Sequence, residues 1–280
     1  MTNSDIQNSG TLTQPLPIPG AGQGEGPDQT QPAPAPGVDH SLARVDLTVV
    51  IPAFNEKDRL GSTLSAVRDY ASKTDRRVQV IVIDDGSTDG TSPLVRQFDR
   101  GPLVLQLIEN GVNRGKGYSV RQGMVAATGR VVLMCDADMS TPIDEVDRLR
   151  AVMESPGGVD IVIGSRDVAG AVLSPAQPWY RRCMGNSLRW FRRRLLLKDL
   201  YDTQCGFKLF RGDVVGPIFA KQTIDRFAFD IEVLAIARGL GYSIREVGVH
   251  WHNDKQSRVR IVRDSLGTLA DLIRIWRRWG

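Results

Sequence analysis

The sequence predicts an α/β fold in which helices cover both faces of a mostly parallel sheet. From residue 47 onward, short apolar runs rich in β-branched residues alternate with stretches of helical periodicity. Each run is continuous rather than broken by alternating polar residues, which is typical of strands buried on both faces. Strands that alternate with helices in this way pair in parallel, so an α/β sandwich is expected.

The expected strands are Leu47–Ile51, Val78–Ile83, Leu103–Ile108, Val131–Cys135 and Val159–Ile163. Helical stretches lie between them, near residues 57–72, 88–99, 116–128 and 142–154. In such sheets, ligands bind beyond the carboxyl ends of the strands. Notable polar segments follow those ends, at residues 52–56, 84–85, 113–117, 136–138 and 164–166. We therefore expect five separate segments of the chain to meet along one edge of the sheet.

Composition divides the chain into three parts. Residues 1–44 are rich in Pro, Gly, Gln, Thr and Ser, and we expect a disordered leader there because this composition buries too little apolar surface to fold. Residues 45–260 form the expected folded domain, and residues 261–280 a basic amphipathic helix. Because the first 43 residues carry four acidic residues and no Lys or Arg, the net charge of +4 corresponds to about +8 for the remainder. That charge indicates an anionic partner, namely nucleotide phosphates, a phospholipid surface or nucleic acid, the alternative being that it only keeps the protein soluble.

The sequence lacks the features of a secreted or membrane-spanning protein, which suggests the cytoplasm. The cysteines Cys135, Cys183 and Cys205 are widely spaced and form no Cys-x-x-Cys pair, so we expect neither a disulfide scaffold nor a zinc site. The N-terminus lacks a basic region followed by an apolar stretch, so no signal peptide is expected. No apolar run approaches the ~18–20 residues that span a bilayer. We expect a cytoplasmic protein that is soluble or lies on a membrane surface.

Two aspartates close the fourth expected strand. Asp136 and Asp138 follow the apolar residues 131–134 and are separated by one alanine. Because residues i and i+2 of a strand point to the same side, both carboxylates are expected to reach one point. Paired carboxylates suit Mg²⁺ or Mn²⁺, which complete their coordination with water and substrate phosphates. The alternative is a strand-end turn with solvated acids.

Two further segments carry residues suited to a nucleotide. Asp85 ends the second strand before a glycine turn, where its carboxylate can accept hydrogen bonds from a nucleobase N–H or a ribose hydroxyl. Lys116 lies between two glycines at the start of a helix, which is a favourable place for a phosphate. This segment lacks the spacing of a Walker or dinucleotide-binding loop. The alternative is an ordinary turn with a solvated lysine.

Two stretches combine arginines with an apolar helical face. Residues 179–198 place five apolar residues on one face and arginines mostly opposite, a pattern that favours an anionic membrane surface. The alternative for this stretch is a core-packed helix with a solvated basic face. The C-terminal stretch has an apolar stripe formed by Val262, Leu266, Leu269, Ile273 and Trp276, and arginines elsewhere at 263, 274, 277 and 278.

Together these residues resemble glycosyltransferase family 2, the nucleotide-sugar-dependent inverting transferases. Within the family, the more specific resemblance is to the polyprenol-phosphate sugar transferases of the dolichyl-phosphate β-glucosyltransferase type. The likeness spans roughly residues 46–275 and rests on VVIPAFNE (49–56), DDGSTDGT (84–91), NRGKGYSVRQGM (113–124), DADMSTP (136–142), IGSR (163–166), DTQCGFKLFR (202–211) and FAFDIEVLAIARGLGY (227–242). It implies a nucleotide-binding α/β sandwich of the GT-A type, with residues 45–260 as the catalytic domain.

The resemblance also implies where the donor binds. The residues implied to hold the nucleoside are Pro52, Ala53, Glu56 and Asp85. Asp136 and Asp138 would bind the divalent ion that bridges the diphosphate, Mg²⁺ or Mn²⁺. Mannosyl relatives often carry Gln two residues after the second aspartate, where this chain has Ser140. Lys116 is expected at the same donor site, and Ser257 and Arg258 are expected to close over the diphosphate.

Three residues are expected to take part in the transfer itself: Asp138, Arg166 and Asp230. Arg166 would contact the phosphate of the donor or the acceptor, the alternative being a surface ion pair. Asp230 stands where many family members place a catalytic acid, and it would act as a base or orient the acceptor. The alternative for Asp230 is an acid at a helix N-terminus, favoured there by the helix dipole.

The implied reaction moves glucose from UDP-glucose to a polyprenyl (dolichyl-type) phosphate at the cytoplasmic face of the membrane. The expected partners are a nucleotide-sugar donor, the lipid phosphate and an anionic membrane surface. GDP-mannose as donor and a soluble acceptor stay open as alternatives. Nucleic acid is not expected, because no base-reading module is recognisable and the acidic edge would repel phosphates without a metal ion.

Overall fold

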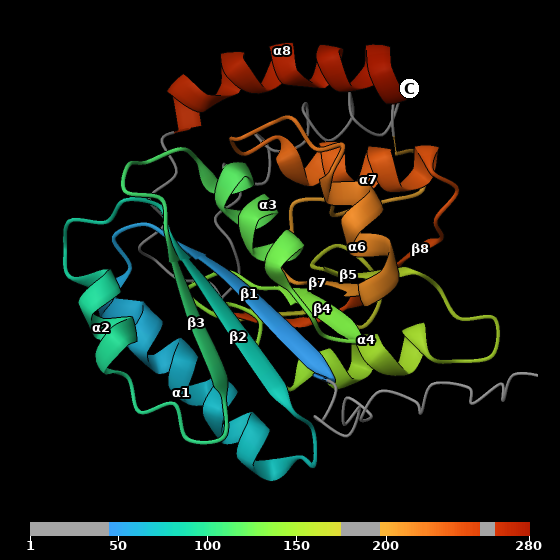
Figure 1. Cartoon of the computed structure of the whole chain (residues 1–280). Coiled ribbons are helices and arrows are strands. Elements are labelled where there is room, and N and C mark those ends of the chain that lie inside the picture. The colour runs from blue at the N-terminus through green and yellow to red at the C-terminus, as the bar shows by residue number, and fades with distance from the viewer. Residues whose placement is uncertain (1–44, 175–196, 253–260) are drawn as a thin grey trace, which may run out of the picture. The chain divides into compact units, whose positions relative to one another are not determined.

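The computed structural model describes residues 45–174, 197–252 and 261–280, with no side-chain account for residues 261–269. Its centre is a seven-stranded sheet of order β3-β2-β1-β4-β7-β5-β8 (Figure 1). The strands are β1 (Leu47–Ala53), β2 (Val78–Asp84), β3 (Val104–Glu109), β4 (Val131–Met134), β5 (Ile161–Ser165), β7 (Lys208–Arg211) and β8 (Ile244–Gly248). Every pairing is parallel except those of β7, which runs antiparallel to β4 and β5. The predicted mostly parallel sheet is confirmed.

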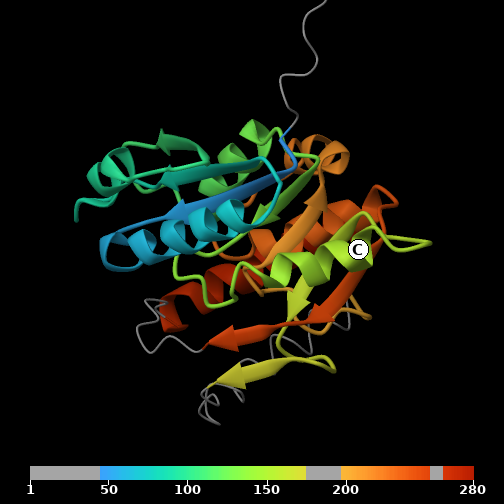
Figure 2. The same cartoon turned by 90° about the horizontal axis from the view of Figure 1, so that it is seen from below.

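Helices cover both faces of this sheet, as Figure 2 shows from below. They are α1 (Lys57–Lys73), α2 (Thr91–Gln97), α3 (Lys116–Ala126), α4 (Glu145–Met153), α6 (Gly212–Phe219), α7 (Phe229–Gly239) and α8 (Ile261–Trp279). Side chains alternate along each strand, so Val49 and Ile51 of β1 join one apolar core while Val50 joins the other. The first core includes residues of α1, α2 and α4, and the second includes residues of α3, α6, α7 and α8.

The five predicted strands all exist, with ends that shift by a few residues. β5 begins two residues later than expected, and β4 ends at Met134, one residue before Cys135. Two further sheet strands, β7 and β8, were not predicted. A short parallel pair, β6 (Val172–Ser174) and β9 (His250–His252), was also missed. These strands are short, and β7 and β8 carry charged residues within them, so apolar periodicity does not reveal them.

Helix α8 lies against α7. Leu272 and Ile275 are buried in the same core as the inner face of α7, whereas Ile273 and Trp276 are exposed. Of the helices that the structure describes, none combines the length and the apolar character that a membrane span requires.

Candidate active site

The loop after β4 carries the two aspartates that the sequence singled out. Because β4 ends before Asp136, both acids lie in a turn and not, as expected, on one face of a strand. The Met139 amide donates to the Asp136 carbonyl (3.1 Å), and Met139 has a positive φ of 44°. The Thr63 hydroxyl of α1 donates to the Ala137 carbonyl (2.7 Å) and so anchors the turn. A non-glycine residue at positive φ persists only where its surroundings hold it, and this is common at functional loops.

The two carboxylates have different partners. Asp136 accepts a hydrogen bond from Lys116 Nζ (2.6 Å), and its side chain is 38% exposed. Burial raises the pKa of Asp136, but the charge and hydrogen bond of Lys116, together with the charges of Lys208 and Arg166, leave the pKa below its ordinary value. Asp138 accepts from the Ser140 amide (3.0 Å) and hydroxyl (2.9 Å), and Arg59 lies 3.7 Å from its other oxygen. Both carboxylates remain partly open to solvent.

This pair fits a divalent ion of the Mg²⁺ or Mn²⁺ class. Carboxylate oxygens are the hard donors that such ions prefer. A Cβ added at Gly206 would lie 2.0 Å from Asp136 Oδ2, so this glycine leaves the space that the carboxylate occupies. Within the described ranges, no group of three or more His, Cys, Asp or Glu could hold a metal by itself. Two aspartates and oxygens from water or substrate therefore match the usual way in which proteins bind Mg²⁺.

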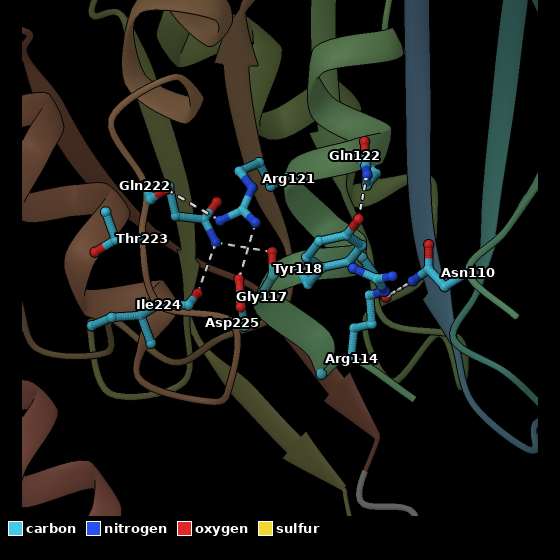
Figure 3. A network of polar contacts seen from close by, with 12 residues as sticks. Asn110, Arg114, Gly117, Tyr118, Arg121, Gln122, Gln222, Thr223, Ile224 and Asp225 are labelled. Carbon is cyan, nitrogen blue, oxygen red and sulfur yellow. Dashed lines mark hydrogen bonds and ion pairs between the residues drawn. The ribbon is translucent and has the colours of Figure 1, made fainter. Parts of the chain in front are cut away.

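Two glycines place Lys116 at this loop. Gly115 has φ 109°, and a Cβ added there would lie 2.4 Å from the Asp225 carbonyl oxygen. A Cβ added at Gly117 would lie 2.4 Å from the Ile224 carbonyl oxygen. Only glycine allows the start of α3 to approach the loop between α6 and α7 so closely. Figure 3 shows this contact, in which the backbone of Gly117 faces Ile224 and Asp225.

Asp85 lies beneath the segment that leads to Lys116. It is 3% exposed, and its carboxylate accepts from the amides of Arg114 (2.9 Å) and Gly115 (2.8 Å) and from Asn110 Nδ2 (2.9 Å). Both oxygens of Asp85 therefore fix the shape of the loop before α3. The nucleoside contact expected for Asp85 stays a prediction.

The end of β1 lies beside β2. The Ala53 carbonyl accepts from the amide of Asp85 (2.8 Å), and Pro52 precedes it in the strand. The carboxylate of Glu56 forms an ion pair with Arg59 (2.6 Å), and this is the same Arg59 that approaches Asp138. The structure thus connects Glu56 to the aspartate turn through one guanidinium, a link that the sequence did not indicate.

Arg166 is held in an ion pair with the buried carboxylate of Asp202. Its Nε and Nη2 donate to the two oxygens of Asp202 at 2.7 and 2.9 Å, and its guanidinium carbon lies 5.4 Å from the centre of the Trp251 ring. Burial raises the pKa of Asp202, but the Arg166 hydrogen bonds and charge outweigh it and lower the pKa to about 2. The guanidinium is thereby fixed in orientation at the end of β5.

Asp230 contacts the ammonium group of Lys208. Asp230 lies in the first turn of α7 and is 5% exposed, and Lys208 on β7 is 1% exposed. Lys208 Nζ also donates to the Cys205 carbonyl (2.6 Å). Asp230 is therefore an acid in the first turn of α7, as in the alternative, and also one member of a buried ion pair.

Three residues that contact the predicted site residues were missed. Lys208 holds Asp230, Asp202 holds Arg166, and Arg59 joins Glu56 to Asp138. The signal for Lys208 was a lysine inside the apolar residues 207–210, where an unpaired charge would be costly.

Some predictions fall outside the described residues. Ser257 and Arg258 lie within 253–260, and the arginine-rich stretch lies mostly within 175–196, neither of which the structure describes.

Comparison with known proteins identifies relatives of the chain. Residues 48–219 match the glycosyl transferase family 2 model. The dolichyl-phosphate β-glucosyltransferase of Dictyostelium discoideum is 32% identical over 243 residues, covering 83% of this chain and 74% of that protein. The human protein of the same name is 32% identical over 216 residues, covering 73% and 67%.

Solved structures share the fold at lower identity. Glucosyl-3-phosphoglycerate synthase from Mycobacterium tuberculosis, crystallised with Mn²⁺, UDP-glucose and phosphoglyceric acid, aligns with a TM-score of 0.59 and 18% identity. The alignment covers 83% of this chain and 80% of that one. This likeness supports the fold assignment.

Proposed function

The chain belongs to glycosyltransferase family 2, and we propose that it transfers glucose from UDP-glucose to a dolichyl-type polyprenyl phosphate. The observation that carries the choice of sugar and acceptor is its 32% identity, over most of its length, to dolichyl-phosphate β-glucosyltransferases. The geometry supports binding of a nucleotide-sugar donor, because acids, a lysine and glycines from separate segments surround the turn after β4.

Asp136 and Asp138 would hold the divalent ion. When bound, Mg²⁺ or Mn²⁺ would neutralise the developing charge of the nucleotide diphosphate that leaves the sugar. Lys116 already lies at Asp136 and adds a second positive charge where that diphosphate would lie. We assign the nucleoside to the neighbouring ends of β1 and β2, where Pro52, Ala53, Glu56 and Asp85 lie. Ser257 and Arg258 are proposed to cover the diphosphate.

The acceptor needs orientation more than deprotonation. A phosphate monoester is already ionised near neutral pH, so no strong base is required to make it a nucleophile. The main task is to bring two anions together in the correct geometry. Arg166 offers a fixed positive charge for one of them, since Asp202 holds its orientation. Asp230 is better suited to organise nearby cations than to take a proton, because Lys208 already pairs with it.

A membrane-facing surface on α8 would bring the enzyme to a lipid acceptor. Ile273 and Trp276 are 39% and 46% exposed, next to the buried Leu272 and Ile275. Arginines 274, 277 and 278 occupy the remaining exposed side of the helix. A helix that combines exposed apolar side chains with arginines fits the surface of an anionic bilayer. We therefore propose peripheral binding at the cytoplasmic membrane face.

The direct test is transfer of labelled sugar into lipid. Purified protein with Mn²⁺ or Mg²⁺ is incubated with polyprenyl phosphate and labelled UDP-glucose, and with GDP-mannose in parallel, and label in the lipid phase is counted. Label from UDP-glucose supports the proposal. Label from GDP-mannose alone would overturn the choice of sugar but keep the reaction class.

A separate measurement tests the membrane surface. Flotation with vesicles that contain phosphatidylserine should recover the protein, and replacing Ile273 and Trp276 with Ser should reduce the bound fraction. The matched control is Val125→Ser, because Val125 is 61% exposed and lies on α3, outside α8. No lipid label together with no vesicle binding would favour a soluble acceptor.

A further inference from the structure

Lys208 is a buried cation that the transfer chemistry outlined above does not use. It begins β7, in the middle of the sheet, with 1% of its surface exposed. A buried ammonium is costly unless it is paired and hydrogen-bonded. Its partners are the Asp230 carboxylate and the Cys205 carbonyl. Lys208 pairs across the sheet with Met134, the last residue of β4, two residues before Asp136. Its charge helps to lower the pKa of Asp136, after the larger effects of burial, which raises it, and of Lys116.

Asp230 and Lys116 occupy the first turns of two helices that press together. A Cβ added at Gly117 would lie 2.7 Å from the Cβ of Phe229, so α3 and α7 meet directly. The Tyr118 amide donates to the Asp225 carbonyl (3.1 Å), and Gln222 Nε2 donates to the Gly117 carbonyl (2.9 Å) (Figure 3). This contact brings the charges of Asp230 and Lys116 close to each other.

The charges of two acids therefore act on Lys116, although only Asp136 contacts it. Burial lowers the pKa of Lys116, but Asp136 and Asp230 both act to raise it, and the pKa ends well above its ordinary value. Lys116 makes its hydrogen bond with Asp136, whereas Asp230 makes its own with Lys208. The two lysines share the two acids, one lysine to each.

We propose that Lys208 is a positioning residue, which occupies Asp230 so that Lys116 stays at Asp136 and meets the donor diphosphate there. The inference rests on the proposed function only in taking a nucleotide diphosphate as the ligand of that site. Lys116 Nζ lies 5.9 Å from the ring centre of Phe229, the residue before Asp230, so without the ammonium of Lys208 the Asp230 carboxylate would attract Lys116. Lys116 would then be drawn away from the Asp136 side, and the donor diphosphate would lose a positive charge.

The test is a mutant cycle that measures UDP binding. Lys208→Met and Lys208→Gln remove the charge, and Lys208→Arg keeps it. Calorimetric titration with UDP in the presence of Mn²⁺ should show about tenfold weaker binding for the uncharged variants, within the range that changes in a coupled network produce. Because arginine keeps the charge and also hydrogen-bonds carboxylates, Lys208→Arg should bind UDP more tightly than either uncharged variant. Because Asn cannot capture Lys116 as a carboxylate can, adding Asp230→Asn to Lys208→Met should restore UDP affinity.

Urea unfolding separates positioning from stability. Lys208→Gln keeps a hydrogen-bond donor and provides a folded comparison if Lys208→Met does not fold. Arg238→Met, which removes an ion pair with Asp199 (2.7 Å) at the far end of α7, is the matched control and should bind UDP normally. Unchanged UDP affinity in a folded Lys208→Met or Lys208→Gln protein would overturn the proposal, and so would a double variant that stays as weak as Lys208→Met.

This readout is independent of the sugar and of the acceptor. A wild-type protein that binds UDP but transfers no glucose would contradict the proposed function while the mutant cycle remains readable. If GDP binds in place of UDP, the same cycle is run with GDP.

Discussion

Two lysine–aspartate pairs lie at this site and differ mainly in exposure. The side chains of Lys116 and Asp136 are 24% and 38% exposed, whereas those of Lys208 and Asp230 are 1% and 6% exposed. Water can solvate both groups of the outer pair when they separate, so the outer pair is free to exchange partners with a ligand. Opening the inner pair would leave charges without solvation. We conclude that the outer pair is suited to bind and the inner pair to hold position.

The largest expected effect is the loss of an outer carboxylate. Asp136→Asn should reduce kcat for lipid glucosylation by about 10²–10³, the size of effect that follows the loss of a charge-stabilising group. The free energy of unfolding should change little, because Asp136 is partly exposed. Steady-state kinetics and urea unfolding check both. Asp144→Asn, at an exposed acid before α4, is the matched control. An active Asp136→Asn enzyme would remove the basis for assigning binding to the outer pair.

A pair whose carboxylate is buried should instead show its effect in stability. Asp202→Asn leaves Arg166 without its bidentate partner, and we expect the free energy of unfolding to fall by about 3 kcal/mol. Asp213→Asn breaks an exposed pair with Arg211 and should cost less than about 1 kcal/mol. Urea unfolding of both variants measures the difference. Equal losses would show that exposure does not separate the two kinds of pair.

Lowering the pH should weaken the same ion pair, between Asp202 and Arg166. The pKa of Asp202 is about 2 in the folded protein, below its unfolded value of about 3.9, so the folded state favours the ionised form. The resulting stabilisation, about 2 kcal/mol, is present above pH 4 or so and is lost as the pH falls towards 2. The free energy of unfolding, measured by urea titration from pH 6 to pH 3, should therefore fall less steeply for Asp202→Asn than for the wild type. Parallel curves would contradict the pairing.

The sequence predicted the outer region better than the inner one. Asp136 and Asp138 follow the end of β4, and Lys116 lies between two glycines at the start of α3, both places to which the α/β pattern itself directs attention. Even there the reason was partly wrong, because the acids lie in a turn with Met139 at positive φ and not on a strand face. Apolar periodicity predicts strands and helices, and it gives no signal for a backbone turn of this kind.

The inner region could not be read in the same way. Pairing Lys208 with Asp230 requires β7 to enter the sheet antiparallel between β4 and β5, and local patterns do not specify such long-range order. Asp202 and Arg166 are likewise 36 residues apart in sequence. Whether a charged pair can open to bind a ligand or only holds position depends on its burial, and burial follows only from the assembled fold.

The connection between the two pairs is the last feature to test, and its expected effect is the smallest. Gly117→Ala would place a Cβ 2.4 Å from the Ile224 carbonyl oxygen, so α3 must shift away from α7, at a cost of about 1–3 kcal/mol in unfolding free energy. Gly61→Ala in α1 is the matched control, since its nearest neighbour would lie 3.7 Å away and the helix should gain up to about 1 kcal/mol. If the two pairs are coupled through this contact, Gly117→Ala should also weaken UDP binding, while Gly61→Ala should not. A destabilised Gly117→Ala protein with normal UDP affinity would mean that the outer pair keeps its geometry without the inner one.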